Sequence, residues 1–269
     1  MMRLLIASLL AAWLAGAPVA GQGADALEAA NRDFERGAAL LEDAPSEARA
    51  LLLSAVAGYT AALEARENGH LRYNLGNAYA LLGEHGRASL EYRRAARLLG
   101  ADRDLRANAA QLPSAGAVRP SVGARLESAA LMWRGVVPVR VVFWAGALAW
   151  AGCWLALWLT ATRRGGRWAP AACAACAAAG AALMGSLAFE RVRDASAPEV
   201  VAIERVVGRK GPDERAYEPS FAEPLAPGLS ARVVEDRGSW VRLRLRDGRD
   251  TWTPRSAVEP VFAARRAGG

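Results

Sequence analysis

Two long, uncharged apolar runs constrain the fold of this 269-residue chain more than any other feature. Residues 141–161 are rich in leucine, valine and tryptophan, whereas residues 169–189 are mostly alanine. A helix of about 20 apolar residues is long enough to cross a bilayer. The first run should insert alone, and the second should insert by packing against it, because Gly180, Ala181 and Gly185 permit close backbone approach. The sequence therefore predicts a hairpin of two transmembrane helices.

The charges around this hairpin predict its orientation. The loop at residues 162–168 carries three arginines and no acid, so it should face the cytoplasm. Residues 1–24 begin with an arginine and an apolar run and end in small residues, which is the layout of a secretory signal peptide. Two cleavage points fit, and an uncleaved anchor helix is the alternative. We therefore expect a protein of the cytoplasmic membrane with both soluble domains on the extracytoplasmic, periplasmic side.

Residues 70–100 have the spacing of two short antiparallel helices that pack closely. One helix has a glycine and a large tyrosine on the face that should pack against an alanine–tyrosine–alanine face of the other helix. This pattern is typical of a tetratricopeptide repeat. Such repeats bind peptides and rarely catalyse reactions. The packing positions are Leu75, Gly76 and Tyr79 on the first helix and Ala88, Tyr92 and Ala95 on the second.

The flanking segments extend this helical region to residues 25–112. Residues 26–65 indicate a degenerate repeat, whose connection at residues 40–51 contains Pro45 and is longer than the pattern allows. Asp102 can cap a further helix that covers the end of the stack. Residues 113–140 predict a linker and a juxtamembrane helix with tryptophan near the membrane surface.

After the second apolar run the hydrophobic pattern changes to a period of two, which indicates strands. Short strands are expected within residues 200–207, 231–235, 240–245 and 251–252, and the Asp247-Gly248 pair predicts a hairpin between the last two. A Pro- and Gly-rich excursion covers residues 210–228. Strands this short predict a small all-β barrel at residues 198–262, followed by a tail at residues 263–269.

These parts together resemble the BatE family of bacterial aerotolerance operons. The motifs RYNLGNAYALLG and ADRDLRAN are similar to that family's repeat and trailing cap, and the domain order matches across nearly the whole chain. The motif GSWVRLRLRDGRDTWTP is similar to the bacterial SH3 signature, although Thr251 stands where glycine is usual. The resemblance implies a non-enzymatic, membrane-anchored scaffold that works with von Willebrand A-domain membrane proteins and a MoxR-type ATPase.

The expected fold is therefore that of a multidomain membrane protein. It combines all-α tetratricopeptide-type helical hairpins, a two-helix transmembrane hairpin and a small all-β SH3-like barrel. Candidate peptide-binding residues are His70, Tyr73 and Asn77, which recur at i, i+3 and i+7, with Asn108 on the cap able to point into the same groove. In some tetratricopeptide proteins, asparagines so placed hold a peptide beside a lysine, and Tyr73 occupies that lysine's position. Ordinary polar surface is the alternative.

The expected barrel offers a second candidate surface in Trp240 and Trp252, with burial of both rings in strands as the alternative. This surface motivates a rival function, a cell-wall-associated module that binds peptidoglycan peptides. A more distant rival is a membrane thiol relay, because Cys173 and Cys176 form a C-x-x-C that Cys153 of the other run could meet. Simple apolar packing of these thiols is the alternative.

The remaining chemistry is unpromising for an enzyme. Neither histidine has a cysteine or histidine at metal-ligand spacing, and no nucleophile motif or glycine-rich phosphate loop occurs. We therefore expect no catalytic residue, metal or cofactor. The net charge of +7 comes from arginines scattered among acids rather than from a basic stripe, which argues against nucleic acid as a partner.

Overall fold

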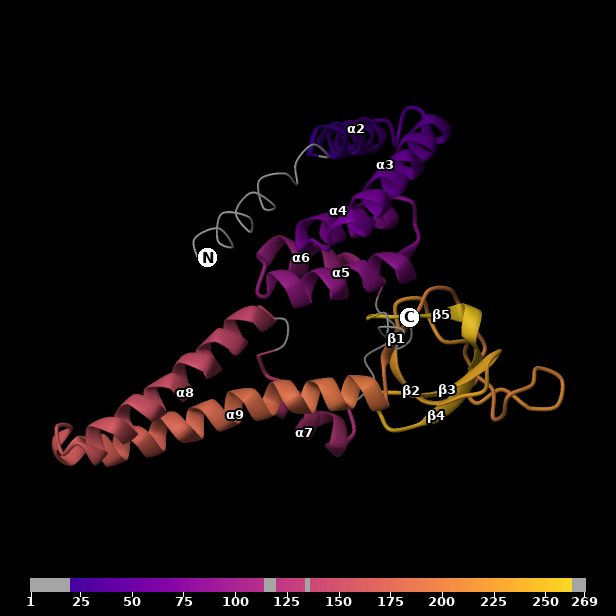
Figure 1. Ribbon diagram of the computed structural model, residues 1–269. Coiled ribbons are helices and arrows are strands. Elements are labelled where there is room, and N and C mark those ends of the chain that lie inside the picture. Colours follow the sequence, from indigo (N-terminus) through magenta and orange to yellow (C-terminus); the bar gives the residue numbers. More distant parts are fainter. Residues whose placement is uncertain (1–19, 114–119, 134–135, 263–269) are drawn as a thin grey trace, which may run out of the picture. The chain divides into compact units, whose positions relative to one another are not determined.

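The computed structural model describes residues 20–113, 120–133 and 136–262 (Figure 1). Within these residues the chain is mostly helical, with eight α-helices and one small antiparallel sheet. Most of the expected signal peptide, residues 1–19, and the expected tail, residues 263–269, lie outside them. The chain folds as two compact units, Met1–Glu67 and Asn68–Gly269.

The first unit contains the helices α2 (Ala20–Ala39) and α3 (Pro45–Ala65), which pack against each other. A Cβ atom on Gly58 would lie 2.6 Å from the Cβ of Ala30, so glycine is needed for this approach. The expectation of a long connection through Pro45 is wrong. Proline occupies the first turn of α3, where its missing N–H removes no helical hydrogen bond.

The second unit begins with α4 (Gly69–Leu81), α5 (His85–Leu99) and α6 (Arg103–Gln111). Asn68 caps α4, and Asp102 caps α6 as expected, accepting a hydrogen bond of 2.8 Å from the Leu105 backbone N–H. The expected close approach of the first two helices is present, because Gly76 lies directly against the ring of Tyr92. Ala88, Tyr92 and Ala95 of α5 form one buried cluster with Leu105 of α6, and Tyr73 and Tyr79 of α4 pack against it.

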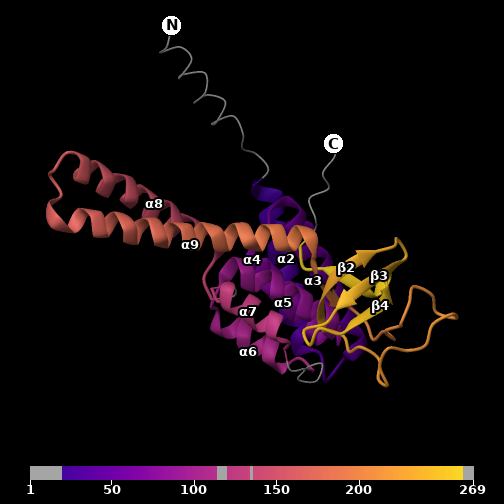
Figure 2. The same cartoon turned by 90° about the horizontal axis from the view of Figure 1, so that it is seen from below.

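The helices α8 (Val139–Ala161) and α9 (Ala169–Ser196) are both long and apolar enough to cross a membrane. They lie side by side in both views (Figures 1 and 2), joined by a 3₁₀ turn at Gly166–Trp168. Gly180 lies against Trp150 of α8, as its size allows, and Gly146 lies against Met184. Nothing lies within 4 Å of a Cβ built on Gly185, so this glycine does not serve the contact as expected.

Two boundaries in this region differ from expectation. Helix α9 continues past residue 189 to Ser196, because its last turns are held by ion pairs described below. The juxtamembrane helix α7 (Val122–Ala130) is shorter than the segment that contains it, and residues 114–119 and 134–135 lie outside the described part. The indole N–H of Trp133 donates to Ser186 Oγ of α9 at 2.6 Å.

The sheet has five antiparallel strands in the order β4-β3-β2-β1-β5. Its strands are β1 (Glu199–Ala202), β2 (Ser230–Asp236), β3 (Trp240–Arg244), β4 (Asp250–Pro254) and β5 (Val258–Pro260). The expected hairpin turn is present, with Gly248 at a positive φ of 91° between β3 and β4. The first strand ends at Ala202 rather than near residue 207, and β5 was not anticipated because three residues are too short to show alternation.

Candidate functional site

Three of the four candidate groove residues form one hydrogen-bonded cluster. The Asn108 side-chain amide donates to Tyr73 Oη at 2.8 Å and to Asn77 Oδ1 at 3.0 Å. Asn77 Oδ1 also accepts from the hydroxyl of Tyr92 at 2.8 Å. His70 takes no part in these bonds and is exposed at the start of α4. The cluster therefore ties α4, α5 and α6 together, and its half-buried edges are what a peptide could contact.

Tyr92 is the buried member of this cluster. It is 3% exposed, and its ring centroid lies 6.1 Å from that of Tyr73. Burial, followed by the proximity of Tyr73, raises the pKa of Tyr92 to about 12. The phenol donates its hydrogen bond to Asn77 Oδ1, and the raised pKa extends the protonated form to higher pH.

The candidate tryptophans lie in different environments. Trp252 is only 7% exposed, and the guanidinium groups of Arg237 and Arg242 lie 4.9 and 5.9 Å from its ring centroid. Trp240 is half-buried at the start of β3. Trp252 therefore offers a ligand little ring area, since it packs into the sheet and beneath two arginines.

The three cysteines meet at the contact between α8 and α9. Cys153 Sγ lies 3.6 Å from Cys173 Sγ, and Cys176 packs against Gly152. All three are free thiols and half-buried in the described structure. Among the described residues, no group of three or more His, Cys, Asp or Glu side chains could hold a metal ion.

A junction that the sequence did not reveal joins α5 to the sheet. The Arg94 side chain donates to the carbonyl of Val261 at 3.0 Å and to that of Pro260 at 2.6 Å. Glu91, 4% exposed, pairs with both Arg94 and Arg72, at 2.5 and 2.9 Å. A buried carboxylate shared by two guanidiniums is costly to break. The only local signal was the i, i+3 spacing of Glu91 and Arg94.

The same region of the chain joins α5 to α9. Arg97 pairs with Glu190 at 2.8 Å and with Asp194 at 3.0 Å, and Glu190 is 2% exposed. The Arg97 guanidinium also lies 3.8 Å from the ring centroid of Phe262. These contacts explain why the charged continuation of α9 stays helical beyond its apolar part.

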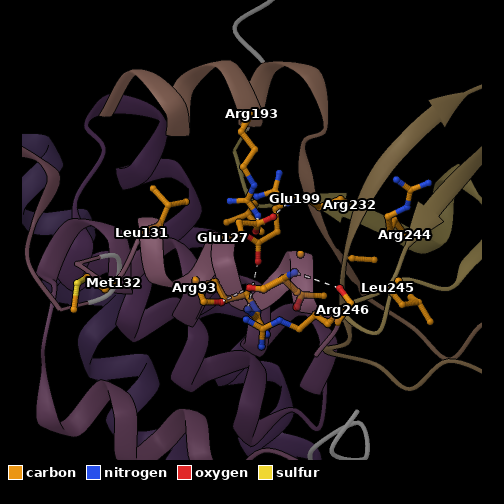
Figure 3. A pocket seen from close by; sticks show the side chains of 18 of the residues that line it. Arg93, Glu127, Leu131, Met132, Arg193, Glu199, Arg232, Arg244, Leu245 and Arg246 are labelled. Carbon is orange, nitrogen blue, oxygen red and sulfur yellow. Dashed lines mark hydrogen bonds and ion pairs between the residues drawn. The ribbon is translucent and has the colours of Figure 1, made fainter. Parts of the chain in front are cut away.

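Between these junctions lies a cavity of about 610 Å³, lined by α5, α7, α9 and the sheet (Figure 3). Its charged lining consists of Arg93, Arg97, Glu127, Arg193, Glu199, Arg232, Arg244 and Arg246. Leu131, Met132, Leu245 and Val261 contribute apolar surface. Nothing in the sequence pattern indicated this cavity, because its lining residues come from segments far apart in the chain.

The cavity charges are partly paired. Glu127 of α7 pairs with Arg193 and lies 3.7 Å from Arg232, and Glu199 lies 3.5 Å from Arg93. Arg244 is held on Asp250 by two hydrogen bonds of 2.8 and 2.9 Å. These bonds keep the pKa of Asp250 below its usual range. Arginine outnumbers carboxylate in the lining itself, but Arg97 and Arg232 also pair with carboxylates just outside it, Glu190 and Asp194.

Comparison of the chain with protein-family models, with curated proteins and with solved structures finds no significant match.

Proposed function

We propose that this protein is a non-enzymatic, membrane-anchored scaffold that holds protein partners next to the cytoplasmic membrane. One observation carries the proposal: α5 is bound directly to the sheet and to the end of α9. Arg94 makes the first junction and Arg97 the second. Two potential interaction modules thus form one platform on a hairpin that is long enough to span a membrane. The resemblance to the BatE family implies the same role.

The helical part supports assignment as a tetratricopeptide-type module. Its two helices approach at Gly76 and Tyr92, and α6 covers the end of the pair. The sheet supports assignment as an SH3-like barrel. A long connection at residues 203–229 separates its first two strands, and the 3₁₀ turn Arg255–Ala257 precedes its last strand, as in that fold.

The orientation that we propose places this platform outside the cytoplasm. Arg97 belongs to the helical module that precedes α8, and it contacts Glu190 and Asp194 at the end of α9, just before the sheet. This contact supports a location of the helical module and the sheet on the same side of the membrane. The signal peptide and the arginines of residues 162–168 support export of that side. A reporter active only outside the cytoplasm, fused after Gly269, should be active, and an inactive fusion at normal expression contradicts the orientation.

The scaffold function can be tested by affinity capture of the full chain from detergent extracts, with bound proteins identified by mass spectrometry. We expect von Willebrand A-domain membrane proteins, and with them a MoxR-type ATPase. Tyr73→Ala combined with Asn77→Ala should reduce capture, because these side chains form the half-buried edges of the hydrogen-bonded cluster. Arg106→Ala, an exposed change on α6, is the matched control.

Two outcomes would contradict this proposal. If the double variant keeps its helical circular dichroism and captures partners as well as the wild type, recognition does not use the cluster. If the full chain captures no protein but sediments with purified cell wall, the rival role in binding peptidoglycan peptides is favoured.

A further inference from the structure

In the cavity of Figure 3, the apolar side chains Leu131 and Met132 lie apart from the arginines, whereas Leu245 lies beside Arg246. Its arginines come from α5, the end of α9 and the strands β2 and β3, with Arg246 in the turn after β3. The apolar side chains Leu131 and Met132 follow α7, next to Trp133. Because Trp133 donates to Ser186, this apolar region lies beside the apolar part of α9. The lining of the cavity thus changes from apolar side chains beside α9 to arginine side chains.

The depth of the charged region corresponds to that of lipid headgroups. Arg193 lies four residues beyond Phe189, where the apolar run ends, and a helix rises 1.5 Å per residue, so Arg193 lies about 6 Å farther along the axis. The polar layer of a bilayer extends roughly 5–8 Å beyond its hydrocarbon core on each side. With Phe189 at the edge of the hydrocarbon core, Arg193 is therefore at the level of phospholipid phosphates.

The charge balance favours an anionic ligand. Six arginines and two glutamates line the cavity, and three of the arginines also pair with carboxylates outside the lining, Glu190, Asp194 and Asp250. Arg246 makes no ion pair with a carboxylate in the described part of the chain, and it is exposed on the turn that holds Ser121 through its backbone carbonyl. Glu127 lies between Arg193 and Arg232, in the position that an anion would take. Guanidinium groups suit phosphate because they donate two parallel hydrogen bonds to its oxygens.

We propose that this cavity binds the phosphate-bearing headgroup of an anionic phospholipid from the adjacent leaflet. The phosphate lies among the arginines, with Arg246 as one donor, and the acyl chains leave past Met132. Basic pockets beside transmembrane helices bind lipid headgroups on the same physical grounds. This inference requires only that α8 and α9 span a membrane, and it is independent of any protein partner.

The test uses the full chain in mild detergent, mixed with equal amounts of phosphatidylglycerol and phosphatidylcholine, with bound lipid counted by native mass spectrometry. We expect phosphatidylglycerol to be retained preferentially. Arg246→Gln should lower its affinity about five-fold, as expected for one partly exposed charged hydrogen bond. Arg205→Gln removes an exposed charge outside the cavity and should leave the affinity unchanged. Equal loss in both variants, or no preference between the lipids, overturns the proposal.

A second arm separates lipid from soluble phosphate esters. Inorganic phosphate or glycerol 3-phosphate should not displace phosphatidylglycerol at comparable concentration, since neither fills the apolar region. Met132→Gln, at a side chain 77% exposed, should weaken lipid binding because it places an amide against the acyl chains. Displacement by the soluble phosphates, or full lipid binding by Met132→Gln, overturns the assignment to a lipid.

Discussion

Substitution of Gly76 is the sharpest test of the helical packing. A Cβ atom at this position would lie 2.6 Å from both Cδ1 and Cε1 of Tyr92. Ordinary contact distances begin near 3.4 Å, so the ring would have to move by nearly an ångström. Tyr92 is 3% exposed and its hydroxyl is bonded to Asn77, so the ring cannot move without breaking that hydrogen bond.

The size of the effect follows from two opposing contributions. Forcing a methyl group into a packed contact costs about 1–3 kcal/mol. Replacing glycine by alanine inside a helix recovers about 1 kcal/mol of backbone entropy. Gly76→Ala should therefore destabilise the helix pair by about 0–2 kcal/mol, and Gly76→Leu by more than that. Gly123→Ala, whose nearest neighbour would be 3.9 Å away, should be neutral or stabilising.

Hydrogen exchange of the full chain, followed by mass spectrometry, reports this locally. Amides of α4 and α5 should exchange about tenfold faster for each 1.4 kcal/mol lost, whereas Gly123→Ala should leave them unchanged. Tyr92→Leu removes the ring and should reduce the additional cost of Gly76→Ala, because the two sites contact each other. Unchanged exchange in Gly76→Leu would refute the assigned contact.

Three further changes probe other contacts. Burial raises the pKa of Tyr92 to about 12, so the stability that its protonated form contributes to the fold is complete below about pH 10 and is lost as the pH rises through 12. Tyr92→Phe should therefore reduce the loss of stability at alkaline pH, measured by denaturation at a series of pH values. Arg94→Ala should raise hydrogen exchange in β5, whose end it binds, and unchanged protection there contradicts the junction. Glu190→Gln should loosen the pairing with Arg97 by about 1–3 kcal/mol, measured as faster exchange at the end of α9; wild-type exchange rates contradict it.

Local patterns were enough to predict most elements. The transmembrane candidates, the α4–α5 pair and the β3–β4 hairpin all depend on signals within about twenty residues, such as apolar runs, Gly76 and the Asp247-Gly248 turn. Three candidate residues of the groove were also placed together, because spacing along α4 determines which side chains share a face.

The features that were missed depend on contacts between distant segments. Residues 190–196 are charged, so hydropathy alone ends the second span at residue 189, but Glu190 and Asp194 bind Arg97 and keep that segment helical. The lining of the arginine-rich cavity comes from segments between residues 93 and 261, and the periodicity of a sequence does not indicate which distant segments will meet. Burial of Trp252 likewise depends on its neighbours in the folded sheet.

The uninterrupted length of α9 has a mechanical consequence. The helix leaves its apolar part at residue 189 and runs to Ser196, and only Ala197 and Pro198 precede β1. Seven residues of helix correspond to about 10 Å, so a short rigid helix, and not a flexible linker, connects the apolar part of α9 to the sheet. In the scaffold that we propose, a partner bound to the sheet would therefore be held at a fixed distance from the end of α9, and a tilt of α8 and α9 would be transmitted to that partner.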